Sequence, residues 1–124
     1  MHRRTAVRPV QILLAGLLGL GVHPVFAESP WMPDGARVQA LVHMVRQDCG
    51  SCHGMRLGGG LGPPLTREAL AGFPLESLAA TIFHGRPGTP MPPWNAMLNE
   101  AEARWIAQQL LQGFPEEKTA SQKP

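Results

Sequence analysis

A five-residue motif, Cys49-Gly50-Ser51-Cys52-His53, constrains this chain more than any other feature. C-x-x-C-H is the attachment signature of a c-type haem, in which two thiols three positions apart form thioether bonds with the vinyl groups of one porphyrin. The adjacent histidine is then held against the iron as its proximal ligand. The motif therefore predicts one covalent haem c on Cys49 and Cys52, with His53 as an axial ligand.

Two other kinds of site use a C-x-x-C pair, and neither suits this sequence. A zinc site needs a second cluster of ligands, whereas Cys49 and Cys52 are the only cysteines in the chain. A thioredoxin-like redox pair needs a βαβ context, and no segment with alternating strand character surrounds the motif. Covalent haem is therefore the favoured interpretation.

Residues 1–27 have the three parts of a secretory signal peptide. A positively charged start and an apolar run over residues 10–22 precede Val25-Phe26-Ala27, a small-residue cleavage site. The apolar run is shorter than the roughly 18 residues that span a bilayer. We therefore expect cleavage before Glu28, no membrane anchor and a soluble protein of the bacterial periplasm. The charged residues at the start are His2, Arg3, Arg4 and Arg8.

The predicted cleavage changes the charge balance. The full chain has 11 basic and 9 acidic residues. Loss of Arg3, Arg4 and Arg8 leaves 8 basic residues against 9 acidic ones, a net charge of −1 with neutral histidines. This balance gives no case for nucleic acid or an anionic membrane as a partner.

Cleavage leaves a chain of one-domain size. We predict an N-terminal arm at 28–34, a folded domain at 35–114 and a polar, mostly disordered tail at 115–124. Glycine and proline are frequent, with 14 and 13 residues, and they cluster at 54–64 and 85–93. These two clusters predict irregular loops on either side of the helices.

Apolar spacing predicts helices and no strands. Val38, Leu41, Val42 and Val45 follow the i, i+3, i+4, i+7 pattern of an amphipathic helix over 35–48. Asn99 is placed to cap a helix that ends at Gly113. Shorter helices fit 66–71, capped by Thr66, and 75–84. The predicted class is all-α.

Met91 is the candidate for the second axial ligand. An iron that carries electrons without binding substrate needs both axial positions filled, and methionine is a soft ligand that raises the reduction potential. Pro90 and Pro92 stiffen the backbone on both sides of Met91. Methionine is more often core filler, but the rigid flanks are missing around the other candidates, Met44, Met55 and Met97.

The sequence resembles the class I c-type cytochromes over nearly all of the mature chain. The matching segments are Cys49 to Gly54, Gly62-Pro63-Pro64-Leu65 and Pro90-Met91-Pro92-Pro93. The resemblance implies a small class I cytochrome c fold, with about four helices and loops wrapped around one covalent haem. It also implies that the Pro63 carbonyl accepts a hydrogen bond from His53.

Within that family the chain is most similar to small periplasmic cytochromes of the NirC type, which are associated with cytochrome cd1 nitrite reductase. The supporting segments are Asp48 to Gly54, Gly59 to Leu65 and Phe83 to Trp94. The chain departs from the usual helix-crossing residues of class I cytochromes at Leu41, Val45 and Gln108, and Trp105 is a candidate to fill the crossing instead.

Three further residues near the predicted loops admit two interpretations each. Arg86 and Trp94 are placed to donate hydrogen bonds to a haem propionate. Arg86 is equally consistent with a solvated side chain, and Trp94 with packing against the porphyrin edge. His84 ends a predicted helix, where a histidine is more often solvated than a metal ligand.

These features predict a periplasmic monohaem electron carrier, monomeric and not an enzyme. The resemblance implies cytochrome cd1 nitrite reductase as acceptor and an upstream quinol-linked donor, in denitrification. The alternatives are a role in d1 haem biosynthesis and nitrite reductase maturation, or electron donation to another terminal reductase or oxidase. Enzymatic haem chemistry needs an open iron position, and Met91 argues for a closed one.

Overall fold

The computed structural model describes residues 31–117, and within this range every regular element is a helix. The predicted all-α class is confirmed for this part of the chain. The signal peptide predicted at 1–27 and residues 118–124 of the predicted tail lie outside the described residues. The helical elements are α1 (Gly35–Met44), the π-helical turn η1 (Val45–Cys49), α2 (Gly50–His53), α3 (Leu75–His84) and α4 (Glu100–Gln112).

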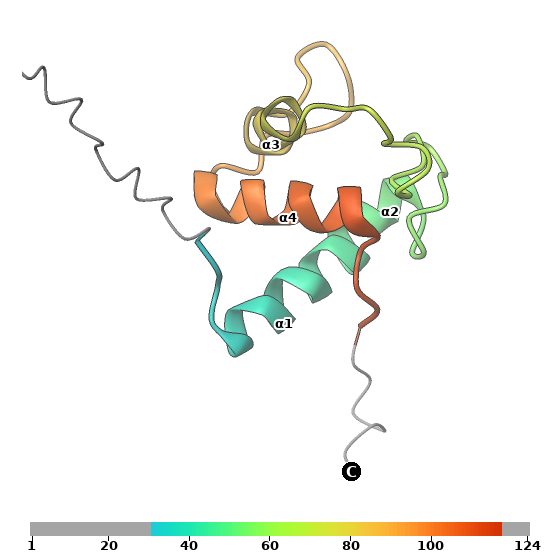
Figure 1. Ribbon diagram of the computed structural model, residues 1–124. Coiled ribbons are helices and arrows are strands. Elements are labelled where there is room, and N and C mark those ends of the chain that lie inside the picture. The colour runs from blue at the N-terminus through green and yellow to red at the C-terminus, as the bar shows by residue number, and fades with distance from the viewer. Residues whose placement is uncertain (1–30, 118–124) are drawn as a thin grey trace, which may run out of the picture.

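α4 lies in the middle of the molecule, with α3 on one side and the run from α1 to α2 on the other (Figure 1). Packing between α3 and α4 is the most extensive contact between separate helices. One hydrophobic core collects side chains from all three layers. Two loops extend from this core, one after α2 and one between α3 and α4 (Figure 1). None of the helices described is long and apolar enough to cross a membrane.

The helix predicted at 35–48 is present, and it continues without a break to His53. Asp34 caps its start by accepting a hydrogen bond from the backbone N–H of Arg37 at 2.7 Å. Its predicted apolar side faces the core, where Leu41 and Val45 are fully buried. The turn η1 was not predicted from the sequence. It has the wider π-helical winding that is frequent at functional sites, and it ends at Cys49.

The helix predicted after Asn99 is confirmed as α4, and its first turn forms a complete capping box. The Asn99 side chain accepts from the Glu102 N–H, and the Glu102 carboxylate accepts from the Asn99 N–H, both at 2.9 Å. This exchange satisfies backbone groups that a helix end otherwise leaves without partners. Trp105 is buried in α4.

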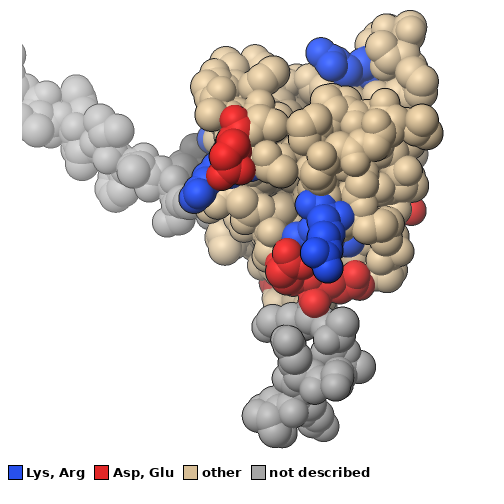
Figure 2. All heavy atoms as spheres, turned by 90° about the vertical axis from the view of Figure 1, so that its right-hand side faces the viewer, with Lys and Arg blue, Asp and Glu red and all other residues tan. Residues whose placement is uncertain are grey.

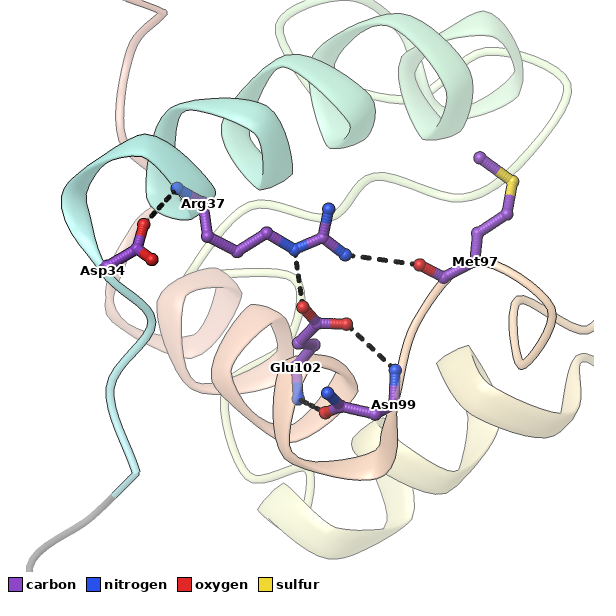
Figure 3. Close-up of polar contacts among 5 residues, drawn as sticks. All are labelled: Asp34, Arg37, Met97, Asn99 and Glu102. Atoms are coloured by element: carbon purple, nitrogen blue, oxygen red, sulfur yellow. Dashed lines mark hydrogen bonds and ion pairs between the residues drawn. The ribbon is translucent and has the colours of Figure 1, made fainter.

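Arg37 connects the first turn of α1 to this capping box (Figure 3). Its Nε donates to the Glu102 carboxylate at 2.5 Å, and its Nη2 donates to the Met97 carbonyl at 3.3 Å. The Glu102 side chain is only 9% exposed. One carboxylate therefore joins the starts of α1 and α4 and the loop that precedes α4.

The helix predicted at 75–84 is confirmed as α3, but the one predicted at 66–71 is wrong. Residues 66–72 form consecutive turns. Thr66 acts as predicted at the start, since its hydroxyl accepts from the Ala69 N–H at 3.3 Å. So short a segment has few hydrogen bonds to offset the cost of starting a helix, and Gly72, at φ 85°, and Pro74 stop its extension.

The Glu102 carboxylate should make folding stability depend on pH. The hydrogen bond from Arg37 and the Asn99 N–H hold the pKa of Glu102 below its ordinary value of 4.5, against the opposing effect of burial. A lowered pKa stabilises the fold at pH values above 4.5, and this contribution is lost as the pH falls through the folded-state pKa. Glu102→Gln should lower the free energy of unfolding at pH 7 by about 1 kcal/mol.

Denaturant unfolding of the holoprotein at pH 7 and pH 3 measures this effect. The substitution should also reduce the loss of stability between the two pH values. Glu100→Gln is the matched control, because Glu100 lies in the same first turn and is exposed. Equal pH dependence in the two variants would contradict the assignment.

Candidate haem-binding site

The two cysteines of the motif lie where η1 passes into α2. Residues three positions apart lie on the same side of a helix, so this run places Cys49 and Cys52 together. Cys49 is half-buried and Cys52 is exposed. Burial, with a smaller contribution from the Asp48 charge, raises the pKa of the Cys49 thiol to about 11. In the chain without haem, Cys49 is therefore a protonated thiol at neutral pH.

His53 follows at the end of α2, and its ring is oriented by one hydrogen bond. The distance from His53 Nδ1 to the Pro63 carbonyl oxygen is 2.7 Å. A carbonyl oxygen only accepts hydrogen bonds, so Nδ1 carries the proton. In the neutral ring the lone pair is then on Nε2, the form in which a histidine binds a metal. The contact between His53 and Pro63 is the one that the family resemblance implied.

The glycine-rich loop after His53 folds back against the end of α2. The N–H of Gly59 donates to the His53 carbonyl and that of Gly62 to the Cys52 carbonyl, both at 2.8 Å. These bonds satisfy carbonyl groups that the last helical turn leaves free. Gly62 also packs against the imidazole, because a Cβ at this position would lie 2.7 Å from His53 Nδ1. The absence of a side chain at Gly62 therefore lets the loop reach the histidine.

Met91 lies in the loop between α3 and α4, and two backbone hydrogen bonds join the outgoing and returning parts of this loop. Arg86 N–H donates to the Met91 carbonyl at 3.1 Å, and Trp94 N–H donates to the Phe83 carbonyl at 3.2 Å. The Thr89 hydroxyl donates to the Arg86 carbonyl at 2.7 Å and accepts from the Met91 N–H at 3.3 Å. The loop is thus held by its own contacts as well as by its prolines.

Gly85 lets two backbone segments of this Met91 loop pass close to each other. Its φ is 69°, a conformation that residues with a side chain rarely adopt. A Cβ on Gly85 would lie 2.6 Å from the backbone of Pro92 and Pro93. Met91 itself is half-buried, whereas Met55 and Met97 are 51% and 52% exposed.

The remaining predicted residues differ in their surroundings. Arg86 has an exposed side chain, and Trp94 is half-buried against the core. His84 is exposed at the end of α3, with its ring edge-on to Phe83 at 5.0 Å between centroids. The structure therefore brings His53, at the end of α2, together with Pro63 of the following loop, and places Arg86, Met91 and Trp94 in the loop between α3 and α4.

Arg46 is the residue of this region that the sequence analysis missed. It lies in η1, and its side chain is only 7% exposed. Its guanidinium donates to the carbonyls of Met55, Phe114 and Pro115. The signal was present in the sequence, because position 46 continues the apolar stripe eight residues after Val38. A charged residue in such a stripe is either paired or functional.

The C-terminal segment 114–117 is packed against this same region. Residue 115 was predicted to start a disordered tail, and within the described part residues 115–117 contact the helical run. Besides the bonds to Arg46, the Glu117 carboxylate lies 2.5 Å from His43 Nδ1 and 3.4 Å from Gln47 Nε2. The pKa of Glu117 is lowered, mainly by the hydrogen bond with His43.

The surface over α2 and the loop after it is poor in charge (Figure 2). The upper middle of this face shows no Lys, Arg, Asp or Glu. Charged side chains of both signs gather in its lower part, near the C-terminal segment, and smaller charged groups lie at the left edge and at the top right. Met55 and Leu61, on the same stretch of chain, are exposed, Leu61 by 94%.

Comparison with known proteins identifies the family. Residues 24–109, more than half of the chain, match the family described as cytochrome C oxidase, cbb3-type, subunit III, so the chain belongs to that family. It is 58% identical to cytochrome c55X of Stutzerimonas stutzeri over 83 residues, which cover 67% of this chain and 74% of the relative. The solved structure of the c-type cytochrome NirC is 56% identical, with a TM-score of 0.63, covering 64% of this chain and 94% of that one. The chain is a NirC-type cytochrome c.

A second solved structure places a similar domain in a larger protein. Dihydro-heme d1 dehydrogenase NirN, in complex with DHE, is 35% identical, with a TM-score of 0.54. The match covers 62% of this cytochrome and 16% of the dehydrogenase chain. The similarity thus extends to a small part of that enzyme.

Membership of the family confirms the predicted cofactor. This cytochrome carries one covalent haem c, and Cys49 and Cys52 fit the attachment motif. The described residues suit that group, because the contact of Nδ1 with Pro63 leaves Nε2 of the neutral His53 ring as the nitrogen available to a metal, directly after the second cysteine in the chain.

The packing of Gly62 on the His53 ring gives a testable expectation. Gly62→Ala should push the ring or the loop away, break the hydrogen bond to Pro63 and cost about 1–3 kcal/mol of folding stability, as for other overpacked sites. Gly58→Ala in the same loop is the control, since a Cβ there meets no atom within 4 Å. Denaturant unfolding of the two holoproteins, together with the NMR resonance of the His53 Nδ1–H, checks the result. Equal stability of the two variants would refute the close packing.

Proposed function

We propose that this cytochrome is a periplasmic electron carrier whose haem iron is held by His53 and Met91. The observation that carries the proposal is the hydrogen bond from His53 Nδ1 to the Pro63 carbonyl, because it leaves Nε2 free to bind a metal beside Cys49 and Cys52. In this proposal the helices and the two loops wrap around the haem as in class I cytochromes.

The bound haem supplies a one-electron Fe(II)/Fe(III) couple. The chain's own residues keep the coordination constant while the charge changes. Pro63 holds the His53 ring in one tautomer, and the closed loop around Met91 keeps the thioether in place. A soft thioether favours the reduced iron and so raises the potential. With both His53 and Met91 bound to it, the iron would have no position left for a substrate, which supports electron carriage over catalysis.

Arg86 and Trp94 are proposed to lie near the haem propionates. Arg86 precedes Met91 on the loop, and its exposed side chain is free to reach a carboxylate at the haem edge. The indole N–H of Trp94 provides a second donor from the other end of the loop. Both contributions are secondary to the iron ligands.

The proposed acceptor is cytochrome cd1 nitrite reductase, with a quinol-linked donor upstream, in denitrification. The similarity to NirC-type cytochromes supports this assignment. Docking would use the charge-poor surface over α2 and the following loop, together with Pro92 and Pro93 (Figure 2). Such redox encounters bury less than about 1,200 Å² and dissociate quickly. The mature protein is proposed to be a monomer, released into the periplasm by cleavage before Glu28.

A second candidate function is assistance in d1 haem biosynthesis and maturation of the nitrite reductase. The observation that favours it is the similarity to part of dihydro-heme d1 dehydrogenase. A small carrier that resembles a domain of that enzyme is suited to exchange electrons with it. Donation to another terminal reductase or oxidase is a further alternative within the same chemistry.

Ligation by Met91 predicts a specific spectroscopic change. The ferric protein should show the weak near-infrared band that arises from charge transfer between a thioether sulfur and iron. Met91→Ala should abolish this band, lower the reduction potential and allow the ferrous protein to bind carbon monoxide. Met97→Ala is the control, since Met97 follows on the same stretch of chain and is half exposed. Loss of the band in Met97→Ala and its survival in Met91→Ala would overturn the assignment.

Electron transfer to the nitrite reductase is tested by stopped-flow mixing of the reduced cytochrome with oxidised cytochrome cd1 enzyme. We expect fast oxidation of this cytochrome, with only a mild dependence of the rate on salt, because its mature net charge is close to zero. Negligible electron transfer, together with loss of d1 haem in a deletion strain, would favour the maturation role instead.

A further inference from the structure

Arg46 is a buried charge that the iron ligation proposed above does not use. It lies in η1, three residues before Cys49, and its side chain is 7% exposed. A buried guanidinium carries a fixed positive charge and is costly unless its donors are satisfied. The partners that stabilise it therefore indicate how the protein keeps a charge at this position.

The partners of Arg46 are mostly neutral carbonyl groups. Nη2 donates to Pro115 at 2.8 Å and to Phe114 at 3.0 Å, and Nη1 donates to Met55 at 3.3 Å. Nε also donates to Pro115, and the guanidinium lies 5.5 Å from the centre of the Phe114 ring. These contacts satisfy the donors without cancelling the charge.

Two carboxylates of the C-terminal segment act on Arg46, and both are partly or fully exposed. Glu117, whose pKa the Arg46 charge helps to lower, is 36% exposed and pairs with His43. Glu116 lies 3.4 Å from Nη2, but its side chain is 88% exposed. Water and salt screen the charge of an exposed carboxylate, whereas they screen a buried guanidinium much less. The C-terminal segment thus covers Arg46 and leaves a positive charge inside the protein.

This charge lies beside the haem-attachment motif. Arg46 precedes Cys49 by one helical turn, a rise of about 5 Å. It also holds the carbonyl of Met55, two residues after His53. The Arg46 side chain therefore connects the backbone three residues before Cys49 with the Met55 carbonyl two residues after His53, which places it along the Cys49–His53 segment.

We propose that Arg46, covered by the C-terminal segment 114–116, raises the reduction potential of the haem. The inference rests on haem ligation by His53 and Met91. Reduction removes one positive charge from the iron, so a nearby fixed positive charge favours the ferrous state. Exclusion of water strengthens this effect, because a buried charge is screened less than an exposed one. The cover formed by Phe114 and Pro115 then has a function besides packing.

The test measures the reduction potential of the purified holoproteins by protein-film or mediated voltammetry. The variants separate the charge at position 46 from the hydrogen bonds that Arg46 donates. Arg46→Met and Arg46→Gln both remove the charge but differ in polarity, and Arg46→Lys keeps the charge while losing the planar set of donors. Arg56→Met is the matched control. Arg56 is exposed, and together with Arg46 it lines a surface hollow of about 390 Å³.

Both neutral variants should shift the potential downward by more than Arg56→Met does, and Arg46→Lys should stay close to the wild type. All the position-46 variants should unfold at lower denaturant concentration than the wild type. Arg46→Lys should therefore lose folding stability and still keep its reduction potential. If Arg46→Met does not yield holoprotein, Arg46→Gln and Arg46→Lys still provide the comparison.

Two results would overturn the proposal. One is a shift in both neutral variants no larger than that of Arg56→Met. The other is an equal downward shift in Arg46→Lys and the neutral variants, which would assign the effect to geometry. The near-infrared sulfur-to-iron band, recorded on each variant, keeps this outcome distinct from a failure of the proposed ligation.

Discussion

The hydrogen bond between His53 and the Pro63 carbonyl is the constraint on which the site depends. It decides which ring nitrogen carries the proton, and so which one is available to a metal. It forms only because the chain turns back within ten residues. That turn needs backbone N–H groups to cap α2 and a glycine small enough to lie against the imidazole. The ligand and its loop are therefore one structural unit.

The two sides of the site are supported in different ways. The His53 side is continuous with the helical run from α1, and Arg46 binds it to the C-terminal segment. The Met91 side is a loop closed on itself, and the contact of Arg37 with Met97 ties the following residues to α1 (Figure 3). In the proposed function, these contacts limit how far His53 and Met91 move when the charge of the iron changes.

Local patterns in the sequence were enough to predict most helices and the attachment motif. Apolar spacing located α1, α3 and α4, and Asn99 marked the start of α4 because capping is a short-range interaction. The helix predicted at 66–71 failed, since its capping signal was real but the segment was too short to continue. The turn η1 had no signal in residue types, because π-helical winding depends on packing.

Long-range contacts were the part that sequence reasoning missed. Nothing near position 46 indicates that its partners lie almost seventy residues later, in a segment that looked like a disordered tail. The pairing of Glu102 with Arg37 spans 65 positions and was not predicted, because only the fold brings the two side chains together. By contrast, the contact between His53 and Pro63 spans ten residues, and the family resemblance implied it.

Proton NMR of the reduced holoprotein tests most directly whether His53 and Met91 close the two axial positions. The ferrous protein is diamagnetic when both positions are filled, and the porphyrin ring current displaces protons held over its face. The account predicts a strongly upfield-shifted methyl resonance that is assigned to Met91, and a His53 Nδ1–H that exchanges slowly because Pro63 accepts it. An upfield methyl assigned to another methionine, or a His53 ring proton in rapid exchange with water, would contradict the account.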